Sequence, residues 1–221
     1  MAYLFKKFSI CILTLIMALS FLTVNQPFAA EGGDGKTIMA FGDSLVAGYG
    51  LPLDQAFPAQ LEAKLKKAGM DVTVLNAGVS GNTTADGLER LEWNLSRAKP
   101  DYAILVMGGN DMLRAIDPAI TRANLQKIMD IFKAHHIPVL IAGMRAFANL
   151  GPQFTSAYAG MYKDIAKQYG AAFYPFYLEG VAMNPDLNQE DGIHPNAAGV
   201  AAIVDKILPS VKELLKKDPA Q

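Results

Sequence analysis

Residues 102–111 read Tyr-Ala-Ile-Leu-Val-Met-Gly-Gly-Asn-Asp, and this stretch decides the fold. Its first six residues form an unbroken apolar run, and two glycines and two polar residues follow. An apolar run without polar–apolar alternation is typical of a strand buried on both faces, as in a parallel sheet. The stretch therefore predicts a central parallel strand with a polar loop at its carboxyl end.

Weaker apolar runs of the same kind lie elsewhere along the chain, at residues 37–41, 72–75, 139–142 and 171–173. Segments with apolar residues at helical spacing alternate with them, at residues 57–68, 84–98, 118–134, 154–169 and 196–215. Strands that alternate with helices form parallel sheets through right-handed crossovers. The sequence therefore predicts the α/β class, as a three-layer α/β/α sandwich with a central parallel sheet of about five strands.

The first thirty residues have the pattern of a secretory signal peptide. Two lysines precede the almost wholly apolar residues 8–24, and two alanines end the segment. We therefore expect residues 1–30 to be removed on export and residues 31–221 to form a single domain, periplasmic or secreted. A membrane anchor is the alternative, since the apolar run is near the lower limit for crossing a bilayer.

Composition argues against several kinds of partner. The formal net charge of −1 is too small to favour binding to nucleic acid. The one cysteine, Cys11, lies in the expected signal peptide, so we expect no disulfide and no thiol chemistry after residue 30. His135 and His136 lack the carboxylates or cysteines that would complete a metal site, so we expect no metal. No phosphate-binding glycine motif is present, and we expect no cofactor.

Three glycine-containing loops follow the first three predicted strands. They hold residues 42–45, 76–78 and 108–111. Loops at the carboxyl ends of parallel strands gather at one edge of the sheet, where ligands bind. We therefore expect these loops to meet in one crevice.

Ser44, Asp191 and His194 have the residue types that nucleophilic acyl transfer needs. A serine hydroxyl becomes a good nucleophile when a neighbouring base takes its proton, and His194 can be that base. Asp191 lies three residues before His194, so its carboxylate can reach the imidazole within one turn and orient it. Taken separately, Ser44 could simply cap the next helix, and Asp191 and His194 could form a structural ion pair.

Donors for a developing oxyanion are present in the same loops. Asn110 offers a side-chain amide after the third strand, and Gly78 offers an unshielded backbone N–H after the second. The N–H of Ser44 is a further donor if a helix begins at that residue. Asn110 also suits a turn, so a purely structural role is the alternative for it.

Together these segments resemble the GDSL, or SGNH, hydrolase family. The resemblance covers residues 38–199 and rests on four blocks: Gly42-Asp43-Ser44-Leu45, Gly78, Gly109-Asn110-Asp111 and Asp191-x-x-His194. It points to the bacterial branch of thioesterase I-like and lysophospholipase L1-like arylesterases. It implies a flavodoxin-like fold with Ser44 as nucleophile, His194 as base, Asp191 as the residue that orients His194, and an oxyanion hole of Ser44, Gly78 and Asn110.

The resemblance implies hydrolysis of carboxylic esters through an acyl-enzyme. The expected substrates are aryl esters, short-to-medium acyl esters and lysophospholipids, with thioesters as a further candidate class. We expect contact with a membrane only through the signal segment or a lipid substrate. Two alternatives stay open, namely a carbohydrate acetylesterase of the same fold and a non-catalytic flavodoxin-like binding domain.

Apolar loop residues near the expected crevice are candidates for the substrate pocket. Tyr49, Phe147 and Leu150 are of this kind, although ordinary packing would also explain them. Members of the family often have prolines in the loop where this chain has residues 144–151, which contain none, so the sequence leaves the size of the acyl group open. Trp93 lies among leucines on a helical pattern, and we expect it to pack in the core.

Overall fold

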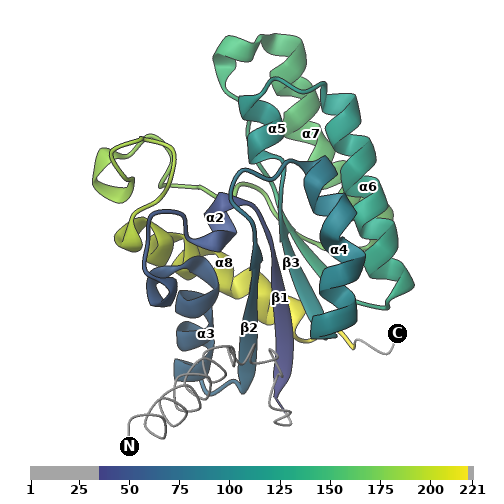
Figure 1. The fold of residues 1–221 in the computed structure, drawn as a ribbon, viewed down its shortest axis with the longest axis vertical. Helices are drawn as coiled ribbons and strands as arrows, with labels where there is room; N and C mark the ends of the chain where they lie inside the picture. The colour runs from purple at the N-terminus through teal and green to yellow at the C-terminus, as the bar shows by residue number, and fades with distance from the viewer. Residues whose placement is uncertain (1–34, 219–221) are drawn as a thin grey trace, which may run out of the picture. The chain divides into compact units, whose positions relative to one another are not determined.

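The computed structural model describes residues 35–218. Their central feature is a parallel sheet with the strand order β2-β1-β3-β4-β5 (Figure 1). The strands are β1 (Lys36–Gly42), β2 (Val72–Gly78), β3 (Tyr102–Val106), β4 (Val139–Ala142) and β5 (Ala172–Tyr174). Within this range no helix has the length and apolarity needed to cross a membrane. The predicted signal peptide, residues 1–30, lies outside the described residues.

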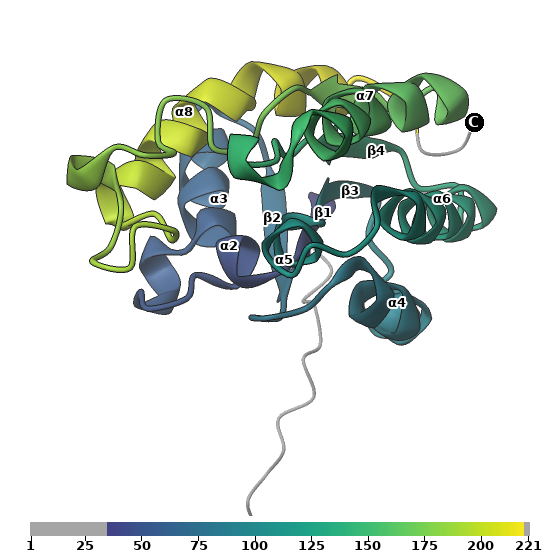
Figure 2. The same ribbon diagram turned by 90° about the horizontal axis from the view of Figure 1, so that it is seen from above.

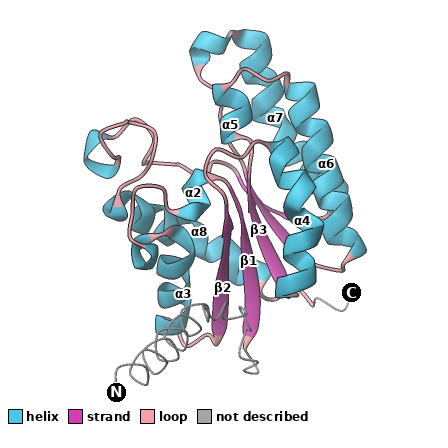
Figure 3. Cartoon of the chain, in the orientation of Figure 1, coloured by secondary structure: helices cyan, strands magenta, loops and turns pink. Residues whose placement is uncertain are grey.

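Helices cover both faces of the sheet (Figures 1 and 2). On one face lie α3 (Phe57–Lys67) and α8 (Ala197–Leu214), which pack against each other. The other face is covered by α4 (Thr84–Ala98), α6 (Pro118–Ala134) and α7 (Pro152–Tyr169), with α6 between the other two. The separation of helix and strand layers in Figure 3 confirms the predicted three-layer sandwich.

The predicted strands and long helices are confirmed, with ends that differ by at most three residues. The largest shift is in β2, because its polar end, residues 76–78, continues to pair with β1. Short helical turns fall between these elements: α2 (Ser44–Ala47), α5 (Gly109–Leu113), η1 (Leu53–Gln55), η2 (Ala148–Leu150) and η3 (Pro185–Leu187). Except for the possible helix start at Ser44, they were not predicted, because a single turn is too short to show a hydrophobic period.

The centre of the core is formed by β3 and β4, in which every residue is buried. This matches the unbroken apolar pattern of their sequences. The prediction that Trp93 packs in the core is wrong, because its side chain is 63% exposed and carries the Arg97 guanidinium over its ring. Trp93 lies two residues from both Leu91 and Leu95, and positions two apart point to different sides of a helix.

Candidate active site

The turn from β1 into α2 carries Ser44. Asp43 is the N-cap of α2, and its carboxylate accepts a hydrogen bond from the N–H of Leu45. Ser44 is therefore the first residue of the helix, at the carboxyl edge of the sheet, and is 9% exposed. Gly42 is needed just before it, since a side chain there would collide with Val46 and with the carbonyl of Val106.

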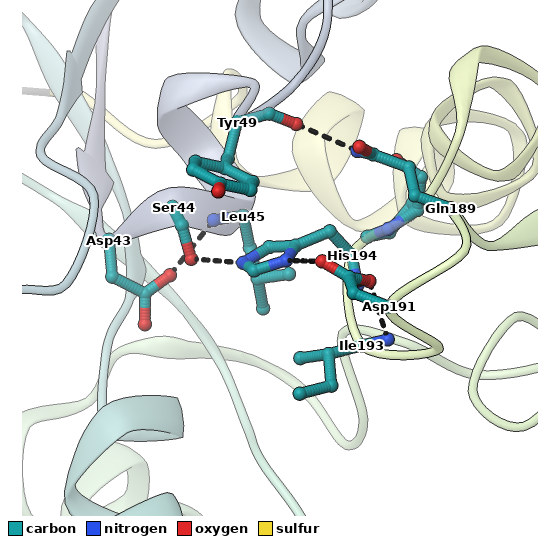
Figure 4. A network of polar contacts seen from close by, with 9 residues as sticks. Asp43, Ser44, Leu45, Tyr49, Gln189, Asp191, Ile193 and His194 are labelled. Atoms are coloured by element: carbon teal, nitrogen blue, oxygen red, sulfur yellow. Dashed lines mark hydrogen bonds and ion pairs between the residues drawn. The ribbon is translucent and has the colours of Figure 1, made fainter.

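His194 lies between Ser44 and Asp191 in a continuous series of hydrogen bonds (Figure 4). Its Nε2 is 2.8 Å from the Ser44 hydroxyl oxygen, and its Nδ1 is 2.6 Å from a carboxylate oxygen of Asp191. An ionised carboxylate can only accept, so the proton of a neutral imidazole resides on Nδ1. Nε2 is then free to accept the Ser44 proton, which is the arrangement a general base requires.

Asp191 is fixed by the backbone of its own turn. The N–H groups of Ile193 and His194 both donate to its Oδ1, at 2.9 and 3.0 Å. Partial burial pushes the pKa of Asp191 upward, but these two hydrogen bonds and the His194 ring outweigh it and lower the pKa to about 2. The carboxylate is therefore ionised at neutral pH and can stabilise a positive charge on His194.

Asn110 lies in α5, beside the loop that follows β2. Its Nδ2 donates to the backbone carbonyl of Asn82 at 3.0 Å and makes a longer contact of 3.4 Å with Asp43 Oδ2. Asp111, the next residue, is buried and accepts hydrogen bonds from Thr84 and Thr121. Asp111 therefore joins α5 to α4 and α6, whereas Asn110 points toward the nucleophile loop.

Gly78 does not offer the free N–H that the sequence analysis expected. Its N–H donates to the side chain of Asn76 at 3.0 Å. A side chain at this position would collide with the backbone of Ala47, so the glycine is required for close packing against α2. The Gly78 amide that the sequence predicts as an oxyanion donor thus already donates to a neighbouring side chain in this structure.

A different glycine in the same loop has an unoccupied amide. Residues 79–82 form a turn closed by a hydrogen bond from the N–H of Asn82 to the carbonyl of Val79. Gly81 has a φ of 83°, which is the third position of a type II turn. The N–H groups of Gly81 and Ser44 make no hydrogen bond within residues 35–218. The Val-Ser-Gly-Asn sequence is the signal that could have indicated this turn.

A small, mostly apolar cavity opens beside Ser44 and His194. Its volume is about 140 Å³, and its lining includes Met112, Leu113, Met144, Phe147, Phe176 and Ile193. Phe147, one of the three residues predicted for a substrate pocket, is in this lining. Leu150 does not line this cavity and instead faces a surface pocket beside α6 and α7. Tyr49 stacks on the His194 ring, with the ring centres 4.6 Å apart, and lies outside the cavity lining.

No group of three or more histidine, cysteine, aspartate or glutamate side chains within residues 35–218 is arranged to hold an ion. His135, at the end of α6, contacts Glu92 at the surface, far along the chain from Ser44.

A parallel α/β sandwich that brings a serine, a histidine and an aspartate together beside an apolar cavity has the architecture of a serine ester hydrolase. The chain belongs to the GDSL-like lipase/acylhydrolase family, whose model matches residues 40–202. This agrees with the resemblance seen in the sequence.

Named relatives support the same class. The chain is 36% identical to the esterase TesA of Pseudomonas aeruginosa, over 92% of this chain and 98% of the relative. It is 34% identical to the Escherichia coli thioesterase 1/protease 1/lysophospholipase L1, over 86% of this chain and 89% of the relative. The crystal structure of AlinE4, an SGNH-hydrolase family esterase, matches with a TM-score of 0.70 and 43% identity, over 84% of this chain and all of that one.

Proposed function

We propose that the protein hydrolyses carboxylic esters through an acyl-enzyme formed on Ser44, with His194 as general base and Asp191 as the residue that orients it. The observation that carries this proposal is the series of contacts at 2.8 and 2.6 Å that joins the three side chains. The apolar cavity beside Ser44 provides a place for the acyl group.

The reaction runs in two halves. Ser44 Oγ attacks the ester carbonyl carbon while His194 Nε2 accepts the hydroxyl proton. The bond to the leaving oxygen then breaks, and His194 returns the proton to the departing alcohol. Water attacks the acyl-enzyme in the same way, which releases the carboxylic acid and restores the Ser44 hydroxyl.

The negative oxygen formed in each half needs donors that point at it. We infer that the N–H of Ser44, the N–H of Gly81 and the Nδ2 of Asn110 supply them. The first two amides have no other acceptor within residues 35–218. Gly81 takes the place that the sequence analysis gave to Gly78, whose amide is engaged by Asn76.

The preferred substrates in this proposal are aryl esters and esters of short-to-medium acyl chains. A cavity of about 140 Å³ is small beside the 300–1,000 Å³ of ordinary ligand pockets. Its apolar lining favours acyl chains over sugars, so we rank a carbohydrate ester below these substrates. The names of the relatives keep lysophospholipids and thioesters as classes to be assayed.

Export of the enzyme belongs to the same proposal and rests on the sequence alone. The lysine pair, the apolar residues 8–24 and the small residues after them are its support. An enzyme outside the cytoplasm would meet esters and lipids of the envelope or the medium.

The replacement Ser44→Ala tests the proposed nucleophile. We expect hydrolysis of p-nitrophenyl butyrate to fall to the rate of the buffer, because the variant lacks the hydroxyl that carries the acyl group in this proposal. Ser96 is the matched control, since it is exposed on α4 and its hydroxyl donates to the backbone carbonyl of Trp93. Ser96→Ala should keep full activity. Residual turnover by Ser44→Ala close to that of the parent would show that the nucleophile is elsewhere.

A further inference from the structure

Arg90 is a partly buried cation on α4 whose guanidinium lies behind the active-site loops. Its Nη2 donates to the carbonyl of Gly42 at 2.7 Å and its Nη1 to the carbonyl of Ala77 at 2.9 Å. Its Nε donates to the side-chain oxygen of Asn82 at 2.7 Å. The planar group also lies over the ring of Phe41, 4.2 Å from its centre, so both its edge and its face are fixed.

The acceptors of Arg90 outside its own helix belong to the segments that carry the proposed oxyanion donors. Gly42 immediately precedes Asp43 and Ser44. Asn82 closes the turn that contains Gly81, and its own backbone carbonyl accepts from Asn110 Nδ2 at 3.0 Å. One guanidinium therefore contacts the Ser44 and Gly81 segments directly and reaches Asn110 through Asn82.

We propose that Arg90 is the positioning residue of the oxyanion site, holding the Ser44, Gly81 and Asn110 donors in one fixed arrangement. This inference rests on the proposed function. Arg90 does not touch the substrate. It acts by fixing Gly42 and Asn82, because a donor displaced by a fraction of an ångström no longer points at the oxygen that becomes charged.

The positive charge of Arg90 also favours formation of the oxyanion. Its four hydrogen-bond acceptors, including Asn94 Oδ1 at 3.2 Å, are all neutral groups. Burial lowers the pKa of Arg90 to about 10, against the attraction of Asp43 and Asp86, so it stays a cation at neutral pH. A positive charge without a contacting carboxylate favours a negative oxygen nearby.

Lysine cannot replace this residue. A guanidinium presents several donors in a fixed plane, whereas an ammonium is a single point charge on a flexible stem. A lysine at position 90 could reach one of the two segments that Arg90 contacts directly but could not span both. The variant Arg90→Lys therefore separates the bridging geometry from the charge, and Arg90→Met removes both.

The test measures kcat and KM on p-nitrophenyl butyrate for both variants, per active site titrated with a p-nitrophenyl phosphonate. Titration counts the folded sites, so loss of protein does not imitate loss of rate. We expect kcat to fall on the order of tenfold to a hundredfold, with little change in KM. Affinity for a boronic acid, which forms a tetrahedral adduct on serine, should fall in parallel. Arg97→Lys on the same helix is the control, since Arg97 is exposed and its guanidinium lies over the exposed Trp93 ring.

Asn82→Ala provides a second variant that leaves Arg90 intact and removes one acceptor. We expect a smaller fall in kcat, and in the double variant with Arg90→Lys the two effects should be less than additive, because they act through one contact. If neither replacement of Arg90 yields folded protein, Asn82→Ala alone decides, and parental kcat in it overturns the proposal.

Parental kcat per titrated site in Arg90→Lys, with only thermal stability lowered, also overturns the proposal. So does a rise in KM alone. These outcomes are distinct from failure of the proposed function, which would appear as an inactive parent or an active Ser44→Ala.

Discussion

Asp43 places an ionisable group directly beside the nucleophile. It is 1% exposed, its Oδ1 accepts from the N–H of Leu45, and its Oδ2 lies 3.4 Å from Asn110 Nδ2. Burial raises the pKa of Asp43 from 3.8 to about 6, although the hydrogen bond from Leu45 and the proximity of His194 oppose the rise. Asp43 stabilises the Ser44 turn, and the free-energy cost of burying its carboxyl group therefore depends on pH.

This raised pKa predicts how stability changes with pH. The folded state holds the Asp43 proton more tightly than the unfolded state, so the group's contribution is full below about pH 4 and is lost as pH rises through about 6. Asp43→Asn cannot titrate. Its melting temperature relative to the parent should therefore increase between pH 4 and pH 7, as measured by circular dichroism.

Asp54→Asn is the control for this measurement, since Asp54 is exposed in η1. Its melting temperature should follow that of the parent across the range. A difference between Asp43→Asn and the parent that stays constant from pH 4 to pH 7 would contradict the raised pKa.

Among the site residues, the contacts between residues close together in the chain were the easiest to predict from the sequence. Asp191 and His194 lie within one turn, so their contact follows from three residues of separation. Ser44 lies 150 positions from His194, and only its place after a strand made that contact predictable. The sequence could not show whether Gly78 or Gly81 has a free backbone N–H. The two differ because the Asn76 side chain accepts a hydrogen bond from the N–H of Gly78.

At the scale of elements, two buried tyrosines of α7 support the turn between β3 and α5. Tyr162 donates to the carbonyl of Met107 at 3.1 Å, and Tyr158 donates to the carbonyl of Gly108 at 3.0 Å. Gly108 has a φ of 105°, and a side chain there would collide with the Tyr162 hydroxyl. The direction in which α5 presents Asn110 thus depends on contacts from a helix fifty residues away.

Removal of one of these hydroxyls should affect both stability and rate. Tyr162→Phe leaves the buried Met107 carbonyl without this donor, which typically costs about 1–3 kcal/mol of unfolding free energy. We expect a lower melting temperature and a lower kcat on p-nitrophenyl butyrate, since the turn that holds Asn110 is loosened.

Tyr169→Phe is a matched control on the same helix. Its hydroxyl bonds to Gln126 and Asp130 at the far end of α7 from this turn. It should leave kcat unchanged. The account of the α5 turn fails if Tyr162→Phe is destabilised but turns over substrate at the parental rate.

Strands and long helices could be predicted from the spacing of their apolar residues, whereas helices of a single turn could not. The unbroken apolar run of β3 reappears as a strand in which every residue is buried. By contrast, residues 108–111 suit a turn and a short helix equally well, and packing against α7 decides between them. The side chains that act through such packing, Arg90 and the two tyrosines, carry no motif that marks them in the sequence.

At the scale of the whole molecule, the carboxyl edge of the sheet combines a small cavity with an exposed apolar rim. Leu113, Phe147 and Ile193 line the cavity and yet are 43–47% exposed, and Met183 is 83% exposed. A short acyl chain fits inside, whereas a long chain would leave part of its length on this open rim. Enclosed contacts remove more apolar surface from water than open ones.

The cavity therefore predicts a preference among acyl chains. Measured as kcat/KM on p-nitrophenyl esters, butyrate should exceed palmitate. Lysophosphatidylcholine, an acyl thioester and an acetylated sugar, assayed alongside, separate the substrate classes that the family includes. A rate that rises steadily up to palmitate would contradict the small cavity as the place where the acyl group binds.

We propose that Ser44 carries the acyl group, and a covalent phosphonate can identify the side chain that reacts. An ethyl p-nitrophenyl phosphonate should release one equivalent of p-nitrophenol and stop ester hydrolysis. Trypsin then yields the peptide of residues 37–64, in which Ser44 is the only serine. The account predicts that mass spectrometry finds the phosphonyl group on Ser44. A label on another residue, or full ester hydrolysis with Ser44 labelled, would contradict it.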